Sequence, residues 1–184
     1  MDVSIMEDPR LTAMGLLSEV YAGLVTRMQP VFGAAGLSEI DFETLIRLGR
    51  SPGHALRMSH LAAQTGLSTS GMTRVVDRLE REGLVAREAC STDRRASYAV
   101  LTEAGHDRLA AVLPRHLEDI DACFTGLLSP DELEAFLRTL RRIRDVVRPC
   151  ATAGVPEQQE QSPQVQAPPA PRARPAAPES RARS

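Results

Sequence analysis

The stretch from residue 68 to residue 83, S-T-S-G-M-T-R-V-V-D-R-L-E-R-E-G, constrains the fold more than any other part of the chain. Its apolar residues recur at the i, i+3, i+4, i+7 spacing of an amphipathic helix: Met72, Val75, Val76 and Leu79. Ser68 is a favoured N-cap residue, and Gly83 suits the left-handed conformation that ends many helices. The pattern predicts a helix that buries one face and leaves the other free.

A second, shorter helix precedes this one. Ser59 is a suitable N-cap for it, Leu61 and Ala62 would be buried, and Gly66 would end it. Two helices joined by a tight turn that contains glycine are typical of a helix-turn-helix motif.

The face opposite the apolar stripe carries small hydroxyl side chains and arginine near the start of the helix. It comprises Ser70, Thr73, Arg74, Asp77 and Arg81. Such groups contact base edges when the N-terminus of a helix enters the major groove, and arginine can donate two hydrogen bonds to guanine. The alternative interpretation is an ordinary solvated helix face.

A β-hairpin is predicted directly after the long helix. Residues 84–88 alternate as a strand does, residues 98–101 can return beside them, and residues 55–58 can add a third strand. The connection, residues 90–96, carries Arg94 and Arg95, which suit a narrow minor groove with enhanced negative potential. An ordinary charged turn is the alternative, but a recognition helix followed at once by such a hairpin favours a winged helix-turn-helix.

These residues resemble the MarR family of transcriptional regulators over about residues 11–148. The matching residues are Ser59 to Ala62, Gly66-Leu67-Ser68, Thr73 to Glu80, Gly83-Leu84-Val85, Asp93-x-Arg95 and Leu101-Thr102-x-x-Gly105. The resemblance implies a homodimer that binds a pseudo-palindromic operator in double-stranded DNA, usually as a repressor that a small molecule releases.

We therefore assign the expected DNA contacts as follows. We expect Ser70, Thr73 and Arg74 to contact bases and Ser68, Thr69 and Arg78 to contact phosphates. Arg94 and Arg95 are expected to enter the flanking minor groove. By resemblance, Asp77 pairs with Arg95, and it supports the wing together with Asp93. The resemblance also implies a pocket for an aromatic effector between the dimerisation helices and the winged domain, with the candidates Tyr21, Met28, Phe42, His54 and Arg57.

The flanking segments predict long helices. A broad apolar stripe covers residues 11–29 before Pro30, Gly33 and Gly36 break it, and Ser38 caps a helix that ends at Gly49. Thr102 caps a helix that extends to about Leu128 with a kink at Pro114, and residues 129–132, S-P-D-E, form a capping box for the last helix.

The fold class is therefore mainly α with a small β-wing. A winged helix-turn-helix domain at about residues 38–101 lies between dimerisation helices at about 11–36 and 102–148. Residues 149–184 hold eight prolines and almost no large apolar residues, which predicts a disordered tail.

Composition narrows the function classes. The formal net charge is −2, and residues 68–95 hold six arginines against five acids, so non-specific affinity for DNA should be modest. No phosphate-binding loop, zinc-ligand spacing or nucleophile motif occurs, so we expect no enzyme activity, no metal and no cofactor.

The sequence has three widely spaced cysteines, Cys90, Cys123 and Cys150, which form no disulfide framework. Neither a membrane-spanning run nor a signal peptide is recognised, so we expect a cytoplasmic protein without a membrane partner. Two alternatives stay open: a winged-helix module that binds protein instead of DNA, and a redox- or metal-responsive regulator, with Cys90 as the candidate redox sensor.

Overall fold

The computed structural model describes residues 3–89 and 97–154. Within them the elements follow in the order α1 Val3–Met6, α2 Pro9–Ala34, α3 Glu39–Gly49, the 3-10 helix η1 Pro52–His54, β1 Ala55–Arg57, α4 Met58–Thr65, α5 Thr69–Arg81, β2 Val85–Ala89, β3 Ser97–Leu101, α6 Glu103–Cys123, η2 Thr125–Leu127, α7 Pro130–Val147 and η3 Pro149–Thr152. The prediction of a mainly helical fold with a small β-sheet is confirmed.

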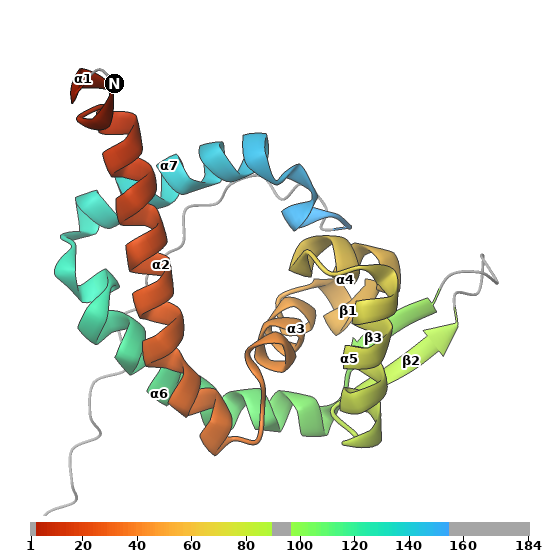
Figure 1. The fold of residues 1–184 in the computed structure, drawn as a ribbon. Coiled ribbons are helices and arrows are strands. Elements are labelled where there is room, and N and C mark those ends of the chain that lie inside the picture. The colour runs from red at the N-terminus through yellow and green to blue at the C-terminus, as the bar shows by residue number, and fades with distance from the viewer. Residues whose placement is uncertain (1–2, 90–96, 155–184) are drawn as a thin grey trace, which may run out of the picture.

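The elements form two groups, which Figure 1 shows side by side. Helices α3, α4 and α5 pack with a three-stranded antiparallel sheet of order β1-β3-β2. In this sheet Ala99 of β3 is opposite Leu56 of β1 and Arg87 of β2, so the predicted hairpin and third strand are both present. The long helices α2, α6 and α7 form the second group.

The helix starts follow the capping residues of the sequence in most places. Ser38 and Asp41 form a capping box on α3, and Ser129 and Glu132 form one on α7. The hydroxyl of Ser68 accepts a hydrogen bond from the Gly71 backbone N–H at 3.1 Å. The prediction for Ser59 is wrong: α4 begins at Met58 with Arg57 as its N-cap, because β1 leads directly into the helix.

Two predicted helix ends also differ from the structure. Helix α2 continues through Pro30 to Ala34, since Met28 and Phe32 are buried and hold its last turns on the core. Helix α6 continues through Pro114 as expected but ends at Cys123, because the backbone leaves the helical conformation at Phe124.

The prediction that residues 149–154 belong to a disordered tail is wrong. Residues 149–152 form η3, which packs on α4, while residues 155–184 lie outside the described part of the chain.

The hydrophobic core lies inside the winged-helix group. The predicted stripe of α5 is its centre, because Met72, Val76 and Leu79 are completely buried against residues such as Leu45 and Leu61 of α3 and α4. Burial of each such side chain contributes about 1.5–3 kcal/mol.

The long helices of the second group are different, because they leave large apolar side chains in solvent. These are Leu11, Met14, Leu16, Leu17, Val20 and Tyr21 of α2, Leu117 of α6, and Ile143, Val146 and Val147 of α7. Helix α7 has no buried residue at all. No helix in the described part of the chain combines the length and apolar character needed to cross a membrane.

The two groups join most tightly at the start of α6. The Thr102 hydroxyl donates a hydrogen bond to the Gly83 carbonyl at 2.7 Å and accepts one from the Gly105 N–H at 3.0 Å. A Cβ atom on Gly105 would lie 2.1 Å from the Leu84 carbonyl oxygen, so this contact requires glycine.

We therefore expect Gly105→Ala to lower the free energy of unfolding by about 1–3 kcal/mol, the usual cost of overpacking a tight site. Urea unfolding monitored by circular dichroism measures the change. The matched control is Gly15→Ala in α2, where a new Cβ has no neighbour within 4 Å; there the substitution should raise helix stability by about 0.5–1 kcal/mol. Equal effects of both substitutions would contradict the close packing at Gly105.

Candidate DNA-binding surface and effector pocket

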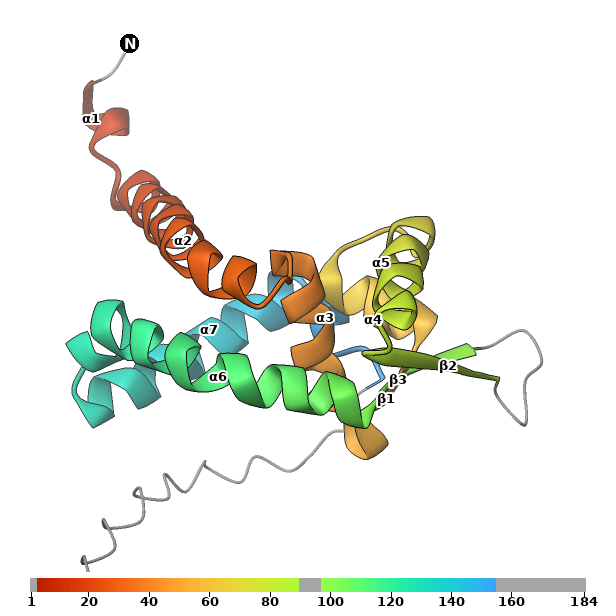
Figure 2. The ribbon, with the colours of Figure 1, turned by 90° about the horizontal axis from the view of Figure 1, so that it is seen from below.

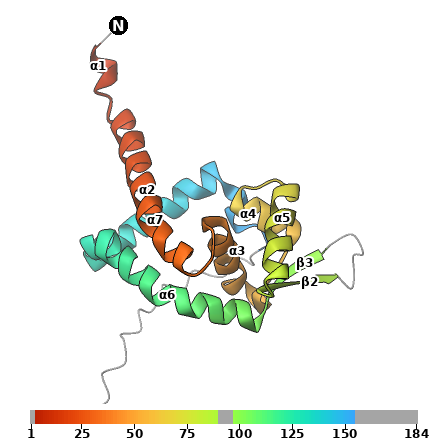
Figure 3. The ribbon, with the colours of Figure 1, turned by 60° about the horizontal axis from the view of Figure 1, so that its bottom comes forward.

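The N-terminus of α5 is an exposed, hydroxyl-rich surface. Ser68, Thr69 and Ser70 are all exposed, and the Ser68 and Ser70 hydroxyl oxygens lie 3.1 Å apart. Figure 3 shows α5 and the β2–β3 hairpin at the end of the molecule opposite to α1. Helix N-termini carry partial positive charge and free N–H groups, which favour phosphate.

The next turn of α5 presents Thr73 and Arg74. The Thr73 hydroxyl donates a hydrogen bond to the Thr69 carbonyl at 2.9 Å, so its oxygen is still able to accept one from a base. Arg74 is exposed, and within the described residues no ion pair or hydrogen bond of its guanidinium is found. The structure thus leaves Arg74 free to reach outward, as the sequence predicted for this face.

Arg78 lies on the inner side of the same helix. Its Nε and Nη2 atoms both donate to Oδ1 of Asp41, whose side chain is only 6% exposed. Asp41 also accepts from the Ser38 backbone N–H at 3.0 Å, so one carboxylate caps α3 and holds α5. The phosphate contact expected for Arg78 stays a prediction. The bonds to Asp41 use one N–H of Nε and one of Nη2, so the two N–H groups of Nη1 and the second of Nη2 are not used in them.

The outer side of α5 is held by Arg87 of β2. Its Nη2 donates to Oδ1 of Asp77 at 2.5 Å and to the Thr73 carbonyl at 3.2 Å. Asp77 thus ties the recognition helix to the hairpin, as a wing support should, but through Arg87. The expected partner Arg95 lies outside the described residues, as do Arg94 and Asp93.

The sequence analysis did not predict that Asp41 and Arg87 hold α5 through ion pairs with Arg78 and Asp77. The S-x-x-D spacing of Ser38 and Asp41 could have identified the capping carboxylate, but no local pattern connects it with Arg78, 37 positions away. For Arg87, the strand alternation gives the face on which the side chain lies but not its partner.

The five candidate pocket residues are not brought together. Met28 and Phe42 are part of the buried core, whereas Tyr21 is 64% exposed on α2. His54 is exposed, with its Nδ1 3.1 Å from the Gly49 carbonyl oxygen, and Arg57 donates to the Tyr98 hydroxyl at 3.1 Å. Their role in ligand binding stays a prediction, and the pocket described next is lined by other residues.

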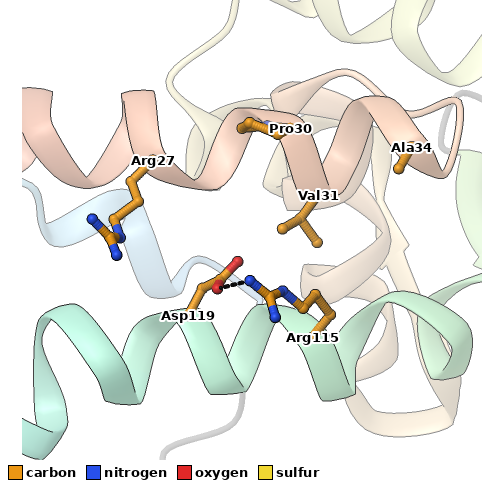
Figure 4. Close-up of a pocket in the computed structure, with 6 residues that line it drawn as sticks. All are labelled: Arg27, Pro30, Val31, Ala34, Arg115 and Asp119. Atoms are coloured by element: carbon orange, nitrogen blue, oxygen red, sulfur yellow. Dashed lines mark ion pairs between the residues drawn. The ribbon is translucent and has the colours of Figure 1, made fainter.

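An open pocket of about 440 Å³ lies between α2 and α6. Figure 4 shows its lining: Arg27, Pro30, Val31 and Ala34 from α2, and Arg115 and Asp119 from α6. Arg115 pairs with Asp119 at 2.8 Å and more weakly with Glu118 at 3.5 Å. The pocket thus combines an apolar wall with cationic groups.

An aromatic cluster joins α2, α3 and α6. The rings of Phe32 and Phe42 stack at 4.4 Å, and His116 contacts both, at 5.1 and 4.8 Å between centroids. Burial lowers the pKa of His116 below its ordinary value, with a smaller opposing effect of Asp119. Its Nδ1 is buried without a hydrogen-bond partner in the described structure. The imidazole is therefore a packing group in its neutral form.

Residues 3–89 and 97–154 contain no group of three or more His, Cys, Asp or Glu side chains that could hold a metal ion. The redox alternative rested on Cys90, which lies outside them.

We expect the Asp41–Arg78 pair to stabilise the fold more than the Asp77–Arg87 pair, because Asp41 is buried and Asp77 is not. Asp41→Asn should cost about 1–3 kcal/mol, below the 3–5 kcal/mol of a fully buried pair because Arg78 is partly exposed. Asp77→Asn should cost less than about 1 kcal/mol.

Double-mutant cycles with Arg78→Gln and Arg87→Gln, read by urea unfolding, measure both couplings. A coupling at Asp41–Arg78 no larger than that at Asp77–Arg87 would contradict this ranking.

The comparisons with known proteins agree with this geometry. The sequence model of the MarR family matches residues 35–96. The transcriptional repressor MprA of Escherichia coli (strain K12) is 31% identical over 127 residues, which cover 68% of this chain and 72% of MprA.

Among solved structures, AbsC, a MarR family transcriptional regulator from Streptomyces coelicolor, superposes with a TM-score of 0.70 at 34% identity, covering 77% of this chain and 96% of AbsC. Sco3205, a MarR family regulator from the same organism solved in complex with DNA, gives a TM-score of 0.70 at 25% identity, covering 77% and 90% of the two chains. The chain belongs to the MarR family of transcriptional regulators, which act by binding DNA and not by catalysis.

Proposed function

We propose that the chain is a cytoplasmic homodimeric repressor that binds a pseudo-palindromic operator through α5. The observation that carries this proposal is the exposed first half of α5. There, hydroxyl groups and the exposed Arg74 face outward from a helix whose other face is buried. The repressor function named for MprA and the DNA complex of Sco3205 support this proposal.

The dimer is supported by the apolar side chains of α2 and α7. Val146 is 81% exposed, Val147 73% and Tyr21 64%, which is unusual for large apolar residues on long helices. Exposed apolar surfaces of this kind mark interaction sites. A second copy of the same chain would bury them, and it would place two α5 helices on one face, as a two-fold operator requires.

Within this dimer, Ser70, Thr73 and Arg74 contact base edges. Ser68 and Thr69 contact phosphate at the start of α5, and Nη1 of Arg78 is available for a further phosphate. Arg94 and Arg95 enter the minor groove from the hairpin connection. The domain limits follow: the winged helix-turn-helix covers about residues 38–101, and the dimerisation helices cover about 11–36 and 102–148.

Arg74→Ala should weaken operator binding by about 1–3 kcal/mol and relax the preference at one base position, because a bidentate contact to guanine is lost. Fluorescence anisotropy with a duplex that the wild-type protein enriches from a randomised pool measures both effects. The matched control is Arg50→Ala, which removes an equally exposed arginine from the end of α3. A uniform loss across scrambled duplexes would reject base recognition by Arg74.

We also propose that a small aromatic anion releases the operator by binding in the pocket between α2 and α6. Pro30, Val31 and Ala34 offer an apolar wall, and Arg27 offers a cation for a carboxylate. Arg115 also lines the pocket, where the ligand carboxylate would compete with Asp119 for its guanidinium. The pocket lies beside the Phe32–Phe42–His116 cluster, which joins these helices to α3 of the DNA-binding part.

Ala34→Trp should fill the pocket and abolish binding of benzoate, the simplest aromatic carboxylate, while operator affinity changes less than threefold. Isothermal titration calorimetry measures ligand binding, and anisotropy measures the operator. Ala110→Trp, at an exposed position of α6 outside the pocket lining, is the control. Benzoate binding that survives Ala34→Trp would place the effector elsewhere.

A further inference from the structure

The chain does not leave the molecule after α7 but returns to the first helix of the helix-turn-helix motif. In Figure 1, α7 leads across the molecule and the following 3-10 helix comes to lie against α4. Three hydrogen bonds hold residues 148–153 there. Arg148 Nη2 donates to the Gln64 carbonyl at 2.9 Å, Gln64 Nε2 donates to the Ala153 carbonyl at 2.7 Å, and Arg47 Nη1 donates to the Ala151 carbonyl at 3.3 Å.

Gln64 is the centre of this contact. It is only 2% exposed, and its amide is satisfied at both ends, because its Oε1 accepts from Arg47 Nη1 at 3.3 Å. Arg47 is itself fixed by Glu43 at 2.6 Å. A buried amide without these partners would carry a desolvation cost of about 1–3 kcal/mol, so the surface of α4 is built for an occupant that offers backbone carbonyl groups.

Two glycines make the fit close. Gly154 has a φ of +78°, and a Cβ there would lie 2.0 Å from Nδ1 of His60 on α4. Gly66, the C-cap of α4, would place a Cβ 2.7 Å from Nη2 of Arg148. The guanidinium of Arg148 thus sits at the C-terminus of α4, where a cation is favoured by the helix dipole.

We propose that residues 148–154 form an intramolecular clasp that docks on a surface formed by Arg47 of α3 and by His60 and Gln64 of α4. The clasp follows directly on Ile143, Val146 and Val147, the exposed apolar end of α7. It therefore ties α4, and through α4 the recognition helix α5 that packs on it, to the helix expected to join the second copy.

The consequence for DNA binding rests on the proposed function. Each winged-helix part is attached to the long helices at the start of α6, and the clasp is an attachment on a different element, α4. A body held at separated points has less freedom to rotate. The clasp should therefore fix the distance between the two α5 helices and make the dimer selective for half-site spacing.

A spin label on Cys150 reports the clasp without DNA. Cys150 is exposed within η3, and Cys90→Ser and Cys123→Ser remove the other thiols. Electron paramagnetic resonance should show a restricted label in this background and a mobile label after Gly154→Ala. Gly53→Ala is the matched control: it has a φ of +63° but no neighbour within 4 Å of a new Cβ, so it has the same backbone strain without the clash. Arg148→Gln provides a second, independent way to open the clasp.

A second experiment measures the effect of the clasp on DNA binding. It compares the affinity for the duplex enriched by the wild-type protein with the affinity for the same duplex carrying one additional base pair between its half-sites. We expect the wild-type protein to bind the lengthened duplex at least tenfold more weakly. Gly154→Ala and Arg148→Gln should reduce this discrimination at least threefold, and Gly53→Ala should leave it unchanged.

A mobile label in the wild-type background would overturn the clasp. A mobile label in both opened variants with unaltered spacing discrimination would overturn its role in DNA binding. Absence of any enriched duplex would instead contradict the proposed function, and the spin-label result would still decide whether the clasp exists.

Discussion

Burial of one face of α5 is the constraint on which the rest of the structure depends. Met72, Val76 and Leu79 enter the core with Leu45 and Leu61, and this packing leaves the hydroxyl and arginine face of the same helix in solvent. Ion pairs then fix the helix on two sides, through Asp41 of α3 and Arg87 of β2. The exposed face of α5 is therefore held in place by the core on the opposite side of the helix and by these ion pairs.

The long helices differ from the winged-helix part, because many of their large apolar side chains are exposed and not buried. Within one chain they leave much of their apolar surface in solvent. Their buried apolar side chains in the described residues are Met28 and Phe32 of α2 and Leu109 and Val112 of α6. Figure 2 shows α2 diverging from α6 away from the winged-helix part. In the described residues, the large apolar side chains of the first half of α2 are exposed. The hydrophobic effect favours a partner for such surfaces, and the DNA-binding geometry would follow from how that partner is arranged.

Local sequence patterns were sufficient to predict most helices and strands of the fold. The stripe of α5, the N-cap at Ser38, the capping box at Ser129 and the glycine at 66 each determine a feature within a few residues, and all are present. The failures are non-local. Pro30 did not break α2 because burial of Phe32 outweighs the lost hydrogen bond, and residues 149–154 are held by Arg47 and Gln64, which lie about 90–100 positions earlier. The Asp41–Arg78 pair could not be found from spacing for the same reason.

Hydroxyl-radical footprinting of the wild-type protein on its enriched duplex tests the central claim most directly, when combined with the stoichiometry of the complex from sedimentation equilibrium. The account predicts two chains per duplex and two protected half-sites, separated by about 10 base pairs or a multiple of that turn, with a two-fold related pattern. A single protected segment bound by one chain would contradict it.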